Sequence, residues 1–75
     1  MKALIEYLAR ALAHNPEQVV VVEEHRSDRV VLHLSVADED KGRVIGRDGR
    51  IANAMRSLLH VAAVRAGVRA SLDID

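Results

Sequence analysis

The sequence predicts an α+β domain in which three helices cover one face of a three-stranded mixed sheet. Apolar residues recur with helical spacing over 1–14 and again over 50–66. They alternate with polar residues over 30–36 and 68–74, which is the two-residue period of a strand with one polar face. The chain has 75 residues, so we expect one domain over 1–75.

The first half of the chain predicts a helix and a strand hairpin. The helix is expected over 1–14, with this apolar stripe: Met1, Leu4, Ile5, Leu8 and Leu12. Asn15-Pro16 ends it, because a residue before proline is pushed out of the helical region. Four consecutive valines favour a strand over 19–25. A polar turn over 26–29 then leads to an antiparallel strand over 30–36.

The second half predicts two helices and a final strand. The acidic run 38–40 favours the start of a short helix over 39–45, because carboxylates suit N-caps and first turns; Mg²⁺ binding is the alternative. A longer helix is expected over 50–66, with this apolar stripe: Ile51, Met55, Leu58, Leu59, Ala62 and Ala66. Gly67 supplies its stop, and the last strand covers 68–74. Since about thirty residues join the second and third strands, these two should be parallel, with a right-handed crossover.

Composition excludes several classes of protein. There is no cysteine, which excludes a disulfide framework and a thiolate metal site. Tyr7 is the only aromatic residue, which argues against RNA-binding modules that stack bases on rings. No apolar run approaches the roughly 20 residues of a membrane-spanning helix, and the N-terminus does not resemble a signal peptide. We therefore expect a cytoplasmic protein without a membrane partner.

The charge is balanced overall but unevenly distributed. Between Lys41 and Arg69 lie seven basic residues and one acid, Asp48, whereas the rest of the chain is acidic. This split predicts one basic face; scattered solvated charge is the alternative.

The strongest candidate for a binding site is the segment around two glycines in the second half. It comprises Lys41, Arg43, Val44, Ile45, Gly46, Arg47, Asp48, Gly49 and Arg50. The glycines allow a tight turn and close approach of a ligand, and the following helix offers unpaired N–H groups. With the nearby basic side chains, the segment suits an anionic backbone such as a run of nucleotide phosphates. The alternative is an ordinary turn between two helices.

The context of this segment resembles a known family. An aliphatic pair, Val44-Ile45, a GxxG loop from Gly46 to Gly49 and a following amphipathic helix resemble the KH domain, in its type II order α-β-β-α-α-β. A free-standing domain of this size is similar to the bacterial KhpA (YlqC-like) family of small RNA-binding proteins. The resemblance covers the whole chain.

The resemblance implies a function, partners and roles for residues. The loop would grip the backbone of about four single-stranded RNA nucleotides, while Val44 and Ile45 form an aliphatic groove floor for bases. It implies an RNA chaperone or post-transcriptional regulator that needs no cofactor. It also implies a homodimer or pairing with a larger KH-containing protein of the KhpB/Jag type. The rival hypothesis is a protein-interaction module without significant RNA binding.

Two residues depart from the family pattern. Ala52 stands where an isoleucine is common, and Asp48 stands where a basic or neutral residue would suit phosphate better. The Asp48 carboxylate has two candidate roles, which are to cap the long helix and to repel phosphates.

The other candidate residues give weaker signals. The four histidines, His14, His25, His33 and His60, lie on different elements without metal-ligand spacing, so we expect no metal site. No nucleophile or acid–base pattern indicates an enzyme. Val61 and Val64 fall outside the helical stripe, which indicates either an interface or isolated surface residues.

Overall fold

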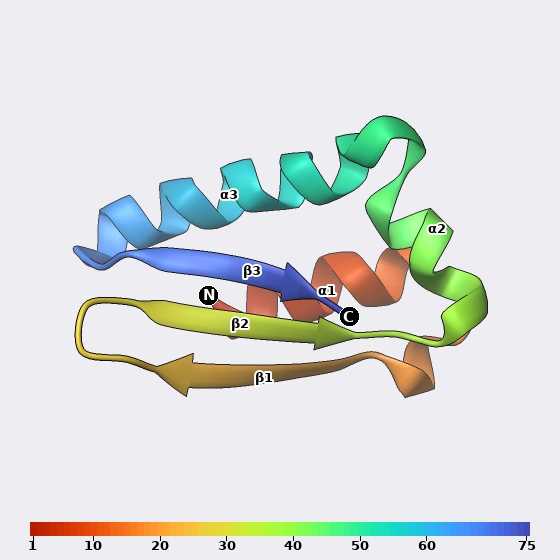
Figure 1. Ribbon diagram of the computed structural model, residues 1–75, viewed down its shortest axis with the longest axis horizontal. Helices are drawn as coiled ribbons and strands as arrows, with labels where there is room; N and C mark the ends of the chain where they lie inside the picture. The colour runs from red at the N-terminus through yellow and green to blue at the C-terminus, as the bar shows by residue number, and fades with distance from the viewer.

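The computed structural model describes residues 1–75 and has the predicted order of helices and strands (Figure 1). In chain order they are α1 (Lys2–Leu12), β1 (Val20–His25), β2 (Val30–Ser35), α2 (Lys41–Ile45), α3 (Arg50–Ala66) and β3 (Ala70–Ile74). Short 3₁₀ turns cover Pro16–Gln18, Asp38–Asp40 and Arg47–Gly49.

The three strands form one mixed sheet in the order β1-β2-β3. β1 pairs antiparallel with β2, with Val21 opposite Leu34. β2 pairs parallel with β3, with Leu32 opposite Leu72. α2 and α3 form the crossover between the two parallel strands (Figure 1). This confirms the predicted parallel pairing and the arrangement that the KH resemblance implies.

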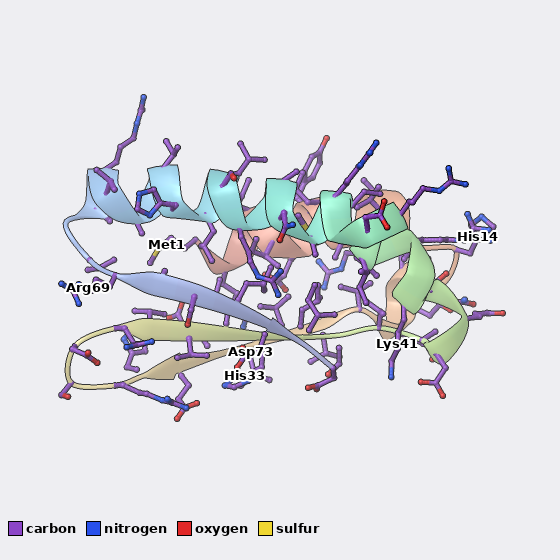
Figure 2. All side chains as sticks on the ribbon, turned by 45° about the horizontal axis from the view of Figure 1, so that its top comes forward. Met1, His14, His33, Lys41, Arg69 and Asp73 are labelled. Carbon is purple, nitrogen blue, oxygen red and sulfur yellow. The ribbon has the colours of Figure 1, made fainter.

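The helices cover one face of the sheet, as predicted. Ile5 of α1, Leu32 and Leu34 of β2, and Leu59 of α3 are fully or almost fully buried in one core. Figure 2 shows the other face, where the labelled His33 and Asp73 point away from the helices. That open face is less polar than expected, because Val20 and Val22 are each about half exposed along β1.

Hydrogen bonds of the loops explain where the structure differs from the predicted ends. α1 stops at Leu12 rather than at residue 14, since the N–H groups of His14 and Asn15 donate to the Asp40 carboxylate. The acidic run forms a 3₁₀ turn, so α2 begins only at Lys41.

The first and last strands are shorter than predicted for a similar reason. Gly67 N–H donates to the Val64 carbonyl and Val68 N–H to the Ala63 carbonyl, which is the Schellman closure of a helix. Val68 therefore takes part in the closure that follows α3, and β3 starts only at Ala70. At the other end, Val19 N–H donates to the Pro16 carbonyl, so β1 starts at Val20.

The buried stripe of α3 is rotated from the predicted one. Leu58 and Ala66 are exposed, whereas the residues that face the core are Ala52, Met55, Leu59 and Ala63. Small residues at 52 and 63 let the helix lie close to its neighbours. Hydropathy alone could not separate these alanines from Ala62 and Ala66.

Candidate nucleic-acid interface

The Gly46–Gly49 loop forms the turn between α2 and α3. Gly46 N–H donates to the Gly42 carbonyl at 2.9 Å and so closes α2. Its backbone, at φ 77° and ψ 171°, lies in a region that is essentially restricted to glycine. A Cβ at Gly46 would lie 2.7 Å from Cγ1 and 3.0 Å from the backbone N of Ile51. Backbone conformation and packing against the first turn of α3 therefore both require glycine here.

The second half of the loop is open to solvent. Asp48 and Gly49 both adopt the left-handed conformation, with φ of 56° and 74°. A Cβ at Gly49 would meet only Asn53 Nδ2, at 3.8 Å. A ligand can therefore approach the backbone at Gly49, next to the N-terminus of α3, where the helix dipole favours an anion. The N–H groups of Gly49 and Arg50 themselves donate to the Gly46 and Arg47 carbonyls.

Asp48 does not have the expected capping role. Gly49 is the N-cap residue of α3, and no side chain donates or accepts a capping hydrogen bond there. The left-handed backbone is one that Asp tolerates better than most residues. Because the Asp48 side chain is exposed and unbonded, only its charge remains to influence a bound anion.

The basic residues of the segment differ in how free their charges are. Arg47 and Arg50 are exposed and have no acidic partner. Lys41 Nζ lies 3.2 Å from Asp38 Oδ1, and Arg43 Nε lies 3.9 Å from Asp40 Oδ1. Arg47 and Arg50 are thus the side chains best placed to attract phosphate.

The two residues of the aliphatic pair, Val44 and Ile45, differ in exposure. Ile45 is exposed over 37% of its surface, so it can touch a base. Val44 is fully buried in the core cluster. Of the pair that the resemblance implied as a groove floor, Val44 therefore lies beneath the surface and Ile45 on it.

Asp40 has a structural role that the sequence did not reveal. Its buried carboxylate accepts hydrogen bonds from the backbone N–H groups of His14 and Asn15 and from Asn15 Nδ2. Burial alone would raise its pKa, but these donors outweigh burial and hold the pKa below its ordinary value. Asp40 stands at the N-cap position of α2, but its carboxylate makes no capping bond there; it joins the segment after α1 to the start of α2.

One contact between α3 and β3 that the sequence did not reveal is made by Arg56. Its Nε donates to the Leu72 carbonyl of β3 at 3.4 Å, and its Nη1 donates to Asn53 Oδ1 at 3.3 Å. The Arg69 carbonyl accepts from Val30 N–H and the Asp75 N–H donates to the Leu34 carbonyl, so both face β2. Because backbone groups of successive residues in a strand point to opposite sides, the Leu72 carbonyl faces the open edge of β3. Arg56 therefore bridges α3 and this edge. A single arginine in the middle of a helix does not indicate such a contact in the sequence.

The remaining charged side chains lie on several parts of the structure. The free arginines lie at both ends of α3: Arg47 and Arg50 at its start, and Arg65 and Arg69 at and beyond its end. His33 Nε2 lies 2.8 Å from Glu24 Oε1 on the open face, and this hydrogen bond, with Arg26, lowers the pKa of Glu24. No three histidine or acidic side chains form a group that suits a metal ion. None of the helices has the length and apolar character to cross a membrane.

Comparison with known proteins shows the family to which the chain belongs. The profile described as KhpA/KhpB, KH domain, matches residues 2–74. A protein of Oceanobacillus iheyensis named RNA-binding protein KhpA is 40% identical over 74 residues, 99% of each chain. Its namesake from Caldanaerobacter subterraneus is 42% identical over the same share of both chains. One from Treponema pallidum is 45% identical over 71 residues, 95% of this chain and 89% of its own. The chain therefore belongs to the KhpA/KhpB family of KH domains.

Proposed function

We propose that this protein binds single-stranded RNA through the Gly46–Gly49 loop and the groove between α3 and β3. The observation that carries the proposal is the open backbone at Gly49, flanked by the unpaired Arg47 and Arg50 at the N-terminus of a 17-residue helix. Relatives over the whole chain are named RNA-binding proteins, which supports it.

The residues of this surface have distinct roles in the proposal. Backbone N–H groups and the two arginines hold the phosphates of about four nucleotides. Ile45 provides aliphatic surface for a base, and the free edge of β3 lies beside Arg56 for polar contacts with base edges. Such a surface binds RNA with modest sequence preference and without catalysis. It suits a cytoplasmic RNA chaperone or post-transcriptional regulator.

Pairing with a second KH domain would compensate for so small a binding surface. Leu58, Val61 and Val64 are about half exposed or more on the outer face of α3. We propose this face as the contact for a homodimer or for a larger KH-containing protein of the KhpB/Jag type. Two linked sites raise the overall affinity through effective concentration. Sedimentation of the parent and of Val61→Lys measures the homodimer: we expect a slower, monomeric variant.

The test of RNA binding is a salt titration with two matched variants. Arg47→Asp reverses a charge at the loop, and Lys2→Asp makes the same change on exposed α1, far along the chain from the loop. With three or four phosphates bound, log affinity of the parent should fall against log salt with a slope of about −2 to −3. We expect Arg47→Asp to lose most of the binding and Lys2→Asp to keep it.

The outcome separates this proposal from the rival hypothesis of a protein-interaction module. A folded Arg47→Asp variant that binds RNA as well as its parent removes the loop from the mechanism. A parent that binds no single-stranded RNA at low salt favours the rival, with the outer face of α3 as the contact surface.

A further inference from the structure

A hollow lies at the end of the molecule opposite the Gly46–Gly49 loop. Two adjoining cavities there, of about 590 Å³ and 440 Å³, share four lining residues: Arg29, Val64, Val68 and Arg69. We call this place the arginine hollow. It contains none of the residues proposed to hold RNA at the loop, and it shares only Val64 with the outer face of α3.

The hollow is built from two turns that are held together. The Val30 N–H donates to the Arg69 carbonyl at 2.8 Å, which joins the β1–β2 turn to the connection between α3 and β3. Figure 1 shows these two turns side by side at the left end of the molecule, whereas the loop before α3 lies at the right. Figure 2 likewise labels Arg69 and Lys41 at opposite ends.

The smaller cavity of the arginine hollow lies between α3 and β3. It is also lined by His60 and Ala63 of α3 and by Ala70 of β3. Arg56 bridges the same two elements nearer the loop, at Leu72. Because α3 has 17 residues, its two ends are about 25 Å apart. The loop and the hollow therefore lie about this distance apart along α3.

The charges in the hollow favour an anion. Arg69 has no acidic partner. Arg29 Nε lies 3.6 Å from Oδ1 of Asp28, an exposed acid that also lines the larger cavity. Arg26, which lines the same cavity, is paired with Glu24. The side chains of Val64 and Val68, both exposed, lie beside these arginines. Positive charge next to apolar surface suits a nucleic acid strand, because its phosphates are anionic and its bases have flat, less polar faces.

We propose that the arginine hollow is a second contact for the RNA backbone, through Arg29 and Arg69, at the end of α3 opposite the loop. This rests on the proposed function and extends it. The loop accommodates about four nucleotides. At about 3.4 Å per stacked nucleotide, the length of α3 corresponds to about seven more. RNA of about twelve nucleotides reaches both places, whereas a four-nucleotide RNA bound at the loop does not.

The experiment compares two RNA lengths and two variants. Pools of single-stranded RNA with random sequence, four and twelve nucleotides long, are titrated by fluorescence anisotropy at 50 and 200 mM salt. The double variant Arg29→Gln/Arg69→Gln removes the charges of the hollow and leaves its backbone hydrogen bonds possible. Arg65→Gln is the matched control, since Arg65 is an exposed, unpaired arginine in the last turn of α3 that does not line the hollow. Thermal melting confirms that each variant is folded.

We expect the double variant to lose affinity for the twelve-nucleotide pool only. Its salt slope with that pool should be shallower by about 1.4, because each phosphate contact to a single strand contributes about 0.7. Over this fourfold change in salt, its affinity disadvantage should shrink about sevenfold. Arg65→Gln should bind like the parent on both pools.

Other results overturn the proposal. If the double variant binds the long pool like the parent, the hollow contacts no RNA, and an acidic protein segment becomes its better ligand. If the double variant loses the same affinity for both pools, the two arginines attract RNA through long-range charge rather than as a second contact. Failure of the proposed function itself looks different, because the parent would then bind neither pool.

Discussion

The two glycines of the GxxG loop should differ in what they contribute to stability. Gly46 has a backbone conformation essentially restricted to glycine, and a Cβ there would lie 2.7 Å from Cγ1 and 3.0 Å from the backbone N of Ile51. Gly49 has an ordinary left-handed conformation and open space before it. Alanine at each position therefore tests two different constraints.

The expected magnitudes follow from this geometry. At Gly46, the backbone conformation costs about 1–3 kcal/mol. The close contact adds about 1–3 kcal/mol, because the Ile51 backbone cannot move aside without disturbing α3. At Gly49, alanine costs about 1–2 kcal/mol for the left-handed conformation alone. A domain of this length has a free energy of unfolding of about 4–11 kcal/mol, so Gly46→Ala should remove a large part of it.

Urea unfolding followed by far-UV circular dichroism measures both effects. Gly46→Ala should lower the free energy of unfolding by about 1–4 kcal/mol more than Gly49→Ala. Gly49→Asn should recover part of the loss, because asparagine tolerates the left-handed region, whereas Gly46→Asn should recover none. If Gly49→Ala destabilises the protein as much as Gly46→Ala, the packing of Gly46 against Ile51 is not a constraint, and the reasoning fails.

Three further substitutions test individual side chains. Asp48→Asn should leave the melting temperature unchanged, since no capping bond is lost, and should tighten RNA binding severalfold at low salt with a gain that fades as salt rises; unchanged affinity at low salt would place the phosphates elsewhere. Asp40→Asn should destabilise the protein most at neutral pH. The folded-state pKa of Asp40 is lowered from 3.8, so its contribution is present above that value and is lost as pH falls through the lower folded-state pKa. The difference in urea midpoint between parent and variant should therefore be smaller at pH 3 than at pH 7. An equal difference at both pH values would contradict the role given to the carboxylate. Arg56→Ala should change the base preference of bound RNA, read by selection from a random pool, more than the mean affinity; an unchanged selected pool would remove Arg56 from recognition.

Much of the fold follows from residue patterns that are strong on their own. Alternation over β2 and the helical period of α1 and α3 identified the elements, and the long helical connection identified the parallel pairing. Element ends failed where a distant partner decides them. α1 stops early because Asp40, 25 residues beyond Asn15, accepts the Asn15 N–H. Local patterns contain no information about such a bond.

The candidate site was likewise predicted in part from the sequence. The GxxG spacing located the loop, because glycine has few reasons to recur there other than backbone conformation. Which neighbouring side chains are accessible could not be predicted, since Val44 and Ile45 are equally apolar, yet one is buried and the other partly exposed. Arg56 was missed because its contact with Leu72 depends on how α3 lies over β3.

The most direct test of the account is an NMR titration of the labelled protein with single-stranded RNA of twelve nucleotides. We expect the largest amide shifts over 46–51, at the loop and the first turn of α3, with further shifts at Arg56 and Leu72. The open face around His33 and Asp73 should change little. Shifts that centre on that face, with the loop unmoved, would contradict the claim that the Gly46–Gly49 loop holds the RNA backbone.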